Sequence, residues 1–244
     1  MTPGSAVDRL QLKAYRHETT SHLACRIRRA LALRRRSRIG SPRVYSDAGN
    51  IYLERDGTKT QLTKTEQDVE PALSPDNSFV VFTRQGRANS SNDDDQFCDT
   101  SPKADELQKI NIDGKNDEVL LRGHKGDGGK QVCGFHVKQF SSDGHRLYFI
   151  SPGWATSGAL HVYDMRKQSE YFMMPANDVL VLSFCKNKYK DYLAIQEHRY
   201  FVFGGSYDWY WLYDSTAKKE IGPLGEFDNP DDAAKHSHED WCSS

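Results

Sequence analysis

Residues 200–214 contain the clearest candidate for a catalytic side chain in this chain, because an apolar run ends there in a Gly-Gly-Ser turn at Ser206. A serine presented by a tight glycine turn is the arrangement of a nucleophile elbow, which leads from a strand into a helix. Here Asp208 and Trp209 follow, and the letters WYWLY favour a second strand. A triad also needs an acid and a histidine on later elements, and only 38 residues follow Ser206. We therefore predict a turn between two strands, and no enzyme.

The same segment is dense in aromatic residues that could instead bind a partner. Alternate residues of a strand point to opposite faces, so Trp209, Trp211 and Tyr213 share one face. Tyr210 and Leu212 share the other. We expect one face to be buried between neighbouring sheets, and an exposed remainder to form a partner-binding patch. The candidate binding residues are Trp154, Tyr207, Trp209 and Trp211.

Three polar segments resemble ligand sites without the spacing that such sites need. An EF-hand loop beginning at Asp93 would place Phe97 at its fifth position, so we expect a solvated loop rather than a calcium site. The glycine-rich segment 123–130 lacks the spacing of a phosphate loop. His236 and His238 make only two firm metal ligands in a tail that we expect to be disordered. No metal and no other cofactor is predicted; the carboxylates weighed for calcium are Asp93, Asp94, Asp95 and Asp99.

The cysteines are far apart and odd in number, and no C-x-x-C motif is present. This pattern argues against a disulfide framework and against a zinc ribbon, although a single disulfide stays open. We expect mostly unpaired thiols that pack in the interior. The five are Cys25, Cys98, Cys133, Cys185 and Cys242.

The net charge of -1 conceals a basic arm and an acidic body. Residues 1–43 hold 11 Lys and Arg against 2 Asp and Glu, and the other 201 residues hold 22 against 32. The body is therefore not expected to bind nucleic acid, which needs a basic surface.

Within the arm, Leu23, Ile27 and Leu31 follow helical spacing opposite several arginines. Such a basic helix could contact an anionic membrane surface, a nucleic acid or an import receptor, and a solvated tail is the alternative. Arginines interrupt every candidate signal-peptide core, and no apolar run approaches 18 residues, so neither a secretory signal nor a transmembrane segment is predicted.

A repeat of about 50 residues supplies the elements that must position these side chains. Residues 49–84 contain strand-length runs separated by an Asp-Gly turn and by Ser-Pro-Asp-Asn, both of which have turn chemistry. The pattern returns over residues 107–151, diverges over 159–197 and begins again over 209–222. One aspartate marks each copy, at intervals of 57, 51 and 50 residues: Asp56, Asp113, Asp164 and Asp214.

Four short strands in about 50 residues make one blade of a β-propeller, and such a blade must stack on its neighbours to bury its faces. The first copy resembles the TolB-type, WD-like propeller repeat, through Ile51-Tyr52, Asp56-Gly57, Leu62-Thr63 and Ser74-Pro75-Asp76. Asn77 stands where glycine is usual, and Leu73 replaces a frequent tryptophan. The resemblance spans residues 44–222.

The resemblance and the repeats imply an all-β chain with a propeller of about four blades, irregular or incomplete. We count three full sets of strands and a leading half-blade extended by residues 44–46, and expect closure or capping by terminal segments. The basic arm would cover residues 1–43, the propeller 44–222 and an acidic tail 223–244.

The predicted function is that of a non-enzymatic scaffold for a protein partner. Contacts are expected at residues 85–105, 123–131, 151–158 and 200–211. The alternative is a regulatory propeller related to hydrolase accessory domains that binds a small ligand or glycan through Trp154, Trp209 or Trp211. The compartment is not set by the residues; the resemblance implies a bacterial envelope.

Overall fold

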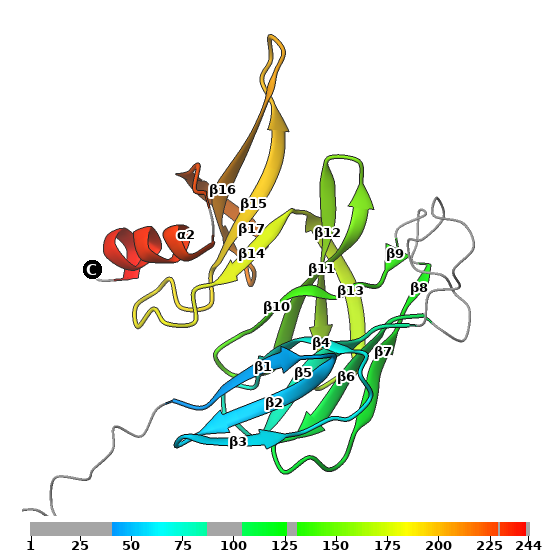
Figure 1. The fold of residues 1–244 in the computed structure, drawn as a ribbon. Helices are drawn as coiled ribbons and strands as arrows, with labels where there is room; N and C mark the ends of the chain where they lie inside the picture. The colour runs from blue at the N-terminus through cyan, green and yellow to red at the C-terminus, as the bar shows by residue number, and fades with distance from the viewer. Residues whose placement is uncertain (1–40, 87–103, 126–130, 229, 243–244) are drawn as a thin grey trace, which may run out of the picture. The chain divides into compact units, whose positions relative to one another are not determined.

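The computed structural model describes residues 41–86, 104–125, 131–228 and 230–242 (Figure 1). The expected basic helix falls within residues 1–40, which lie outside the described residues. Arg43, at the end of the expected arm, already opens the first strand. Everything below concerns the unit that begins at Ser41.

Four antiparallel sheets, here called blades 1 to 4, follow one another along the chain, each with its strands in sequence order (Figure 1). Blade 1 contains β1 (Arg43–Asp47), β2 (Asn50–Arg55) and β3 (Thr58–Gln61). Blade 2 contains β4 (Asp68–Leu73), β5 (Phe79–Arg84), β6 (Glu106–Asn111) and β7 (Glu118–Arg122). Blade 3 contains β10 (His136–Phe140), β11 (Arg146–Trp154), β12 (Ser157–Asp164) and β13 (Ser169–Pro175). Blade 4 contains β14 (Asp178–Val181), β15 (Leu193–Tyr200), β16 (Ser206–Asp214) and β17 (Lys219–Gly225).

Three shorter features complete the described chain. A small hairpin, β8 (His124–Lys125) and β9 (Gln131–Val132), connects blades 2 and 3. After blade 4 come the helix α2 (Pro230–Ser237) and one turn of π-helix, η2 (His238–Cys242). The sheets fit an open, incomplete propeller, which confirms the predicted fold class.

The side chains from which the turns are predicted also form the hydrogen bonds that hold these turns. Ser74 Oγ donates to Asp76 Oδ1 at 2.7 Å between β4 and β5, and Ser141 Oγ donates to Asp143 Oδ1 at 2.6 Å between β10 and β11. Each serine oxygen also accepts a backbone N–H further along the chain, at 3.0–3.1 Å. The Ser-x-Asp turn is therefore the same structure in two blades, held by local side chain to backbone bonds.

The repeating aspartates also have a local structural task. Asp164 Oδ1 accepts the backbone N–H groups of Arg166 and Lys167, both at 3.0 Å, and Asp214 Oδ1 accepts two equivalent groups at 2.8 and 2.9 Å. Both residues end the third strand of a blade. Because Asp56 follows β2 in the same way, β1 to β3 correspond to the second, third and fourth strands of a full blade. The predicted leading half-blade is thus a blade without its innermost strand.

Alternate residues of each strand bury themselves against a different neighbour. In β5, Val80 and Phe82 pack with Ile51 and Leu53 of blade 1, whereas Val81 packs with blade 3. The same alternation in blade 3 sends Leu147 and Phe149 toward blade 2, and Tyr148 and Ile150 toward blade 4. Each fully buried Ile, Leu or Phe contributes roughly 1.5–3 kcal/mol, so these interfaces hold the blades together.

The C-terminal segment covers the face of blade 4 that no further blade covers. Tyr210 and Leu212 of β16 pack there with Leu182, Cys185 and, from α2, Ala233. The expectation of a disordered tail is therefore wrong, because an apolar face of the last blade is available to order it. The expectation that a terminal segment caps the array is confirmed at this end.

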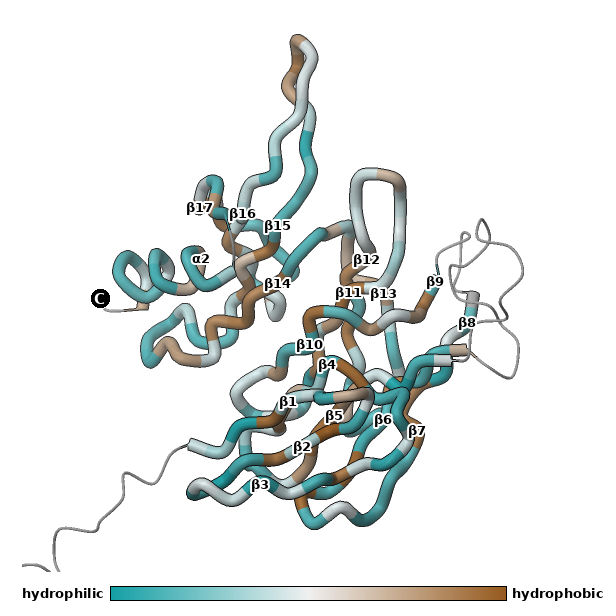
Figure 2. Tube along the Cα trace, viewed as in Figure 1, coloured by the Kyte–Doolittle hydropathy of each residue, from teal (hydrophilic) through white to brown (hydrophobic). Residues whose placement is uncertain are grey.

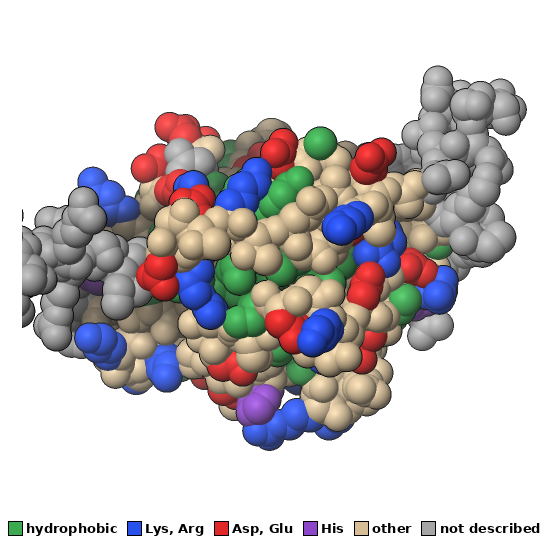
Figure 3. Space-filling model, turned by 60° about the horizontal axis from the view of Figure 1, so that its bottom comes forward, with side chains coloured by type: hydrophobic (Ala, Val, Ile, Leu, Met, Phe, Trp, Pro, Cys, Tyr) green, Lys and Arg blue, Asp and Glu red, His purple; other side chains and the backbone are tan. Residues whose placement is uncertain are grey.

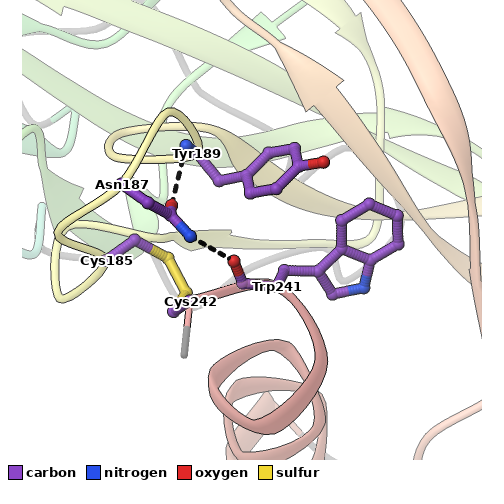
Figure 4. Close-up of a disulfide and its surroundings, with 5 residues drawn as sticks. All are labelled: Cys185, Asn187, Tyr189, Trp241 and Cys242. Carbon is purple, nitrogen blue, oxygen red and sulfur yellow. Dashed lines mark hydrogen bonds between the residues drawn. A yellow bond between two sulfur atoms is a disulfide. The ribbon is translucent and has the colours of Figure 1, made fainter. Parts of the chain in front are cut away.

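A disulfide between Cys185 and Cys242 fastens this cap (Figure 4). Nearby, Asn187 Oδ1 accepts the N–H of Tyr189 at 3.0 Å, and its amide donates to the carbonyl of Trp241 at 2.5 Å. The Tyr189 ring meets the Trp241 ring edge-on at 5.1 Å. Cys133 is disulfide-bonded as well.

The prediction of unpaired thiols is therefore wrong for the three described cysteines, which are all disulfide-bonded. Residues 57 positions apart in the sequence are brought to a Cα separation of 4.7 Å, a proximity that spacing alone does not reveal.

We predict that Cys185→Ala lowers the free energy of unfolding by about 4 kcal/mol, because a cross-link over this separation restricts the unfolded chain. Urea denaturation under non-reducing conditions measures the loss. Cys185→Ala/Cys242→Ala is the control and should lose the same amount, since both variants lack one bond. An unchanged urea midpoint in either variant contradicts the prediction.

Candidate functional site

The contact regions predicted from the sequence leave the blades at one edge. In an antiparallel meander the connections alternate between the two ends of the strands. The β5–β6, β11–β12 and β15–β16 connections therefore lie at the same end of the strands as the links from each blade to the next. We call it the hairpin edge. Figure 1 shows the β11–β12 and β15–β16 hairpins projecting on the same side. Residues 151–158 and 200–211 include the turns of two of these hairpins together with the adjoining strand residues. Of the predicted regions 85–105 and 123–131, residues 87–103 and 126–130 lie outside the described residues.

The tip of the β15–β16 hairpin exposes a run of large apolar side chains. Val202 is 93% exposed and Phe203 is fully exposed, and Tyr200 and Phe201 are also exposed. Figure 2 shows this tip as a hydrophobic stretch beyond polar flanks. Contiguous apolar side chains are normally withdrawn from water, so their exposure at this tip is unusual.

One face of this hairpin carries the predicted aromatic residues in a row. Tyr207 lies 4.7 Å from the ring of Phe201 and 5.0 Å from that of Trp209. Further down the strand, the Arg199 guanidinium lies 3.7 Å from the centroid of Trp211. The same face continues in Tyr213, which packs against the core between blades 3 and 4. The fully buried face of β16 is the opposite one, where Tyr210 and Leu212 pack against the C-terminal cap and not between two blades. The expected burial between blades is limited to the partly buried Tyr213.

An ion-pair network holds the base of the hairpin. Arg199 Nε donates to Glu197 Oε2 at 2.9 Å, and its other arm pairs with Glu220 of β17. The buried Tyr210 hydroxyl donates to Asp178 Oδ2 at 2.6 Å, and burial raises the pKa of Tyr210. These contacts fix the strands from which the apolar tip projects.

Ser206 is the first residue of β16 and lies opposite Tyr200 in the ladder. The predicted turn between two strands is present. His198 and Asp208 form the pair two positions further along the ladder, and His198 Nδ1 lies 2.8 Å from Asp208 Oδ1, an arrangement not foreseen from the sequence. Within this fully described hairpin, no hydrogen bond joins the Ser206 hydroxyl to His198, whose ring lies edge-on to Tyr200 at 5.0 Å. The geometry gives the serine no activating base.

Trp154 lies on the other hairpin, at the end of β11. Its side chain is 49% exposed and lines a pocket of about 620 Å³ with the rest of the β11–β12 turn, Gln131 and Asn177. Among the described residues, no ring contact joins Trp154 to Tyr207, Trp209 or Trp211. The four predicted residues therefore belong to two separate surfaces of one edge.

A second constellation lies where the innermost strands of blades 2 and 3 meet. Glu70 of β4 bonds to His136 Nδ1 at 2.8 Å and accepts from Lys138 Nζ at 3.3 Å. The Lys138 side chain is 1% exposed and also donates to Thr83 Oγ1 at 2.8 Å and to the Phe135 carbonyl. All three ammonium protons therefore have partners, which is how a protein tolerates a buried lysine.

Irregular backbone brings these groups together. Both strands change register here, between Val69 and Ala72 and between His136 and Gln139. Glu70 and Val137 have φ angles of 48° and 51°, a region that a β-branched residue rarely enters. Such conformations cost on the order of 1–3 kcal/mol each, so surrounding contacts must maintain them.

The cluster shifts the ionisation of its members. Burial lowers the pKa of Lys138 to about 8, against the attraction of Glu70. Burial alone would raise the pKa of Glu70, but the hydrogen bond from His136 and the charge of Lys138 hold it below its ordinary value. The bond to Glu70 raises the pKa of His136. The sequence signal was slight: two basic residues at alternate positions of the short strand β10.

Of the remaining candidates, those within the described residues bring no ligand constellation together. The calcium loop with Asp93, Asp94, Asp95 and Asp99 lies outside the described residues. His236 Nε2 pairs with Asp240 at 3.1 Å in the C-terminal cap. Across the part of the chain that the structure describes, no group of three His, Cys, Asp or Glu could hold a metal ion, and no helix is long and apolar enough to cross a membrane.

We predict that the free energy of unfolding rises by about 3 kcal/mol from pH 8 to 10.5, relative to Lys138→Met. In this interval the unfolded lysine, whose ordinary pKa is 10.5, still holds the proton that the folded one has lost. Below pH 8 both states are protonated and the folded state bears the full desolvation cost. Urea denaturation of both proteins at each pH measures the difference between their free energies of unfolding. Groups that titrate alike in both proteins cancel in this difference. A difference independent of pH contradicts a buried, shifted Lys138.

Comparison with known proteins identifies the fold. No protein-family model matches the sequence, and no curated protein matches it. TolB from Acinetobacter baumannii is 13% identical, with a TM-score of 0.51 over 83% of this chain and 45% of its own. The β-propeller domain of the Trilobed protease from Pyrococcus furiosus, described as having an open velcro topology, is 12% identical, with a TM-score of 0.46 over 78% and 57%.

The structure of the nidogen/laminin complex also matches, at 13% identity and a TM-score of 0.44 over 77% and 65%. The chain thus spans less than half the length of TolB and less than two thirds of the other two. Likeness at these identities concerns the fold alone. The resemblance read from the repeats is confirmed at that level: this chain has a TolB-like β-propeller fold.

Proposed function

We propose that this chain is a non-enzymatic propeller that binds a protein partner through the tip of the β15–β16 hairpin. The observation that carries the proposal is the run of four exposed apolar side chains over residues 200–203. Binding would remove them from water, and each buried aromatic ring would contribute strongly to affinity.

The surroundings of the tip suit a protein interface. The Arg199–Glu197 ion pair and the His198–Asp208 hydrogen bond lie below the apolar tip, so an apolar centre is bounded by polar groups. This is the anatomy of a specific protein interface. The opposite edge of the molecule differs: Figure 3 shows acidic and basic side chains interspersed there around a few apolar ones.

The Cys185–Cys242 disulfide supports a location in an oxidising compartment, where such bonds persist. This is compatible with the bacterial envelope that the resemblance implies.

We predict that Val202→Ser/Phe203→Ser weakens partner binding at least 10-fold without lowering stability, because the replaced side chains contact only solvent in the free protein. Full-length protein carrying a photo-crosslinking phenylalanine at position 203 would capture the partner, which is then purified for titration. Val119→Ser/Ile221→Ser, which replaces two exposed apolar residues elsewhere, is the matched control and should bind normally.

Vesicles of phosphatidylcholine and phosphatidylglycerol form the second arm of this experiment. Vesicle binding lost in Val202→Ser/Phe203→Ser would replace the protein partner with a lipid surface. Equal partner affinity for all three proteins would remove the tip from the interface.

We also predict that a fluorophosphonate probe leaves Ser206 unlabelled, because no base is hydrogen-bonded to its hydroxyl. Mass spectrometry of the treated full-length protein checks this, with a known serine hydrolase as positive control. Labelling abolished by Ser206→Ala would overturn the non-enzymatic assignment.

A further inference from the structure

The pocket beside Trp154 is a separate feature of the hairpin edge. It has a volume of about 620 Å³, within the range of small-molecule sites, and is lined by Gln131 of β9, residues 152–158 and Asn177. The exposed tip over residues 200–203 belongs to another hairpin and contributes no side chain to it. Its role is therefore independent of the proposed protein interface.

The pocket has a fixed frame. Asn177 Oδ1 accepts the backbone N–H of Gly158 at 3.0 Å, and its amide donates to the Thr156 carbonyl at 3.2 Å. One side chain thus clamps the turn from the far end of blade 3. Gly158 is required for this fit, because a Cβ there would lie 2.7 Å from a methyl carbon of Ile150 and 2.8 Å from the Ala176 carbonyl oxygen. A cavity formed in advance loses little entropy when a ligand enters.

None of the described residues that line the pocket has a charged side chain. An ionic ligand would lose its hydration there without a counter-charge, which selects for neutral ligands. The wall also contains polar groups, which belong to the backbone, Thr156, Ser157 and the two amide side chains. A purely apolar ligand is therefore disfavoured as well.

Gln131 supplies the most specific signal. Its Oε1 atom is buried and has no hydrogen-bond partner, although it belongs to a pocket-lining side chain. A buried acceptor without a donor destabilises the protein, and a ligand O–H placed against it would remove that penalty.

Trp154 provides the complementary apolar element. Its ring meets Phe172 in an edge contact at 6.0 Å, which steadies it while half of the side chain is exposed. A flat ring beside a hydroxyl acceptor matches a pyranose, which has an apolar C–H face and donor hydroxyls around its rim.

We infer that the Trp154 pocket binds a neutral carbohydrate, with a C–H face of the sugar on the Trp154 ring and one sugar hydroxyl donating to Gln131 Oε1. The uncharged wall, the unpaired acceptor and the half-exposed ring are the three observations behind this assignment. Asn177 is a positioning residue that acts through the turn.

Saturation-transfer NMR on the full-length protein tests the inference with four uncharged probes: maltose, cellobiose, lactose and N,N′-diacetylchitobiose, each at millimolar concentration. We expect transfer to at least one, strongest at protons of one ring face. Trp154→Ala and Gln131→Leu should each raise the dissociation constant of that sugar about 10-fold or more, which corresponds to ~1.4 kcal/mol. The control Val119→Ser/Ile221→Ser, which changes exposed residues outside the pocket, should leave it unchanged.

Urea denaturation separates lost binding from lost folding. Because Gln131→Leu removes an unpaired buried acceptor, its midpoint should equal or exceed that of the unmodified protein. Absence of transfer from all four sugars overturns the inference, as does binding that survives Trp154→Ala. Transfer from a blocked neutral tripeptide, acetyl-Gly-Pro-Ala-amide, in place of the sugars would reassign the pocket to peptide.

Discussion

A four-stranded antiparallel sheet cannot bury either of its own faces, and the stacking of blade on blade meets that constraint throughout the described chain. Val80 and Val81, adjacent in β5, enter different cores for this reason. The alternation of strand side chains thus becomes an alternation of interfaces. Strand-length apolar runs interrupted by short polar turns follow from the same requirement, since each residue of a central strand faces one neighbour or the other.

The two ends of the stack meet the constraint by different means. Blade 4 is covered by α2, with Ala233 in the shared core and the Cys185–Cys242 bond beside it. On the outer face of blade 1, the rings of Tyr45 and Tyr52 stack at 5.7 Å, and Lys59 Nζ lies 3.9 Å from the centroid of Tyr52. Amphipathic side chains can cover apolar area while their polar groups reach water.

At the hairpin edge, two hairpins extend beyond the cores that hold the blades together. β15 and β16 continue past the core of blade 4, and the tip exposes Val202 and Phe203. The β11–β12 hairpin likewise extends to Trp154. Strain is placed elsewhere, on the inner strands, where Glu70 and Val137 have unusual φ angles beside a buried lysine. A firm centre and protruding hairpins are a suitable combination for presenting binding surfaces.

The sequence by itself determined the features that depend on neighbours within a few residues. The Ser-x-Asp turns at Ser74 and Ser141 and the turn aspartates such as Asp164 are closed by bonds spanning two to five positions, so the repeats and strands could be read directly. The division of β16 into a face with Trp209 and Trp211 and a face with Tyr210 and Leu212 was also foreseeable, because strand alternation assigns faces without tertiary information.

Tertiary structure alone decided the features that depend on distant partners. Glu70 and Lys138 are 68 positions apart, and they meet only because two bulged inner strands lie together. Cys185 and Cys242 are 57 positions apart, and the tail is ordered because blade 4 offers it an apolar face. Gln131 and Asn177 meet the Trp154 hairpin from two different connections. Local hydrogen bonding leaves a signature in short spacing, whereas packing between blades joins residues whose separation along the chain carries no such signature.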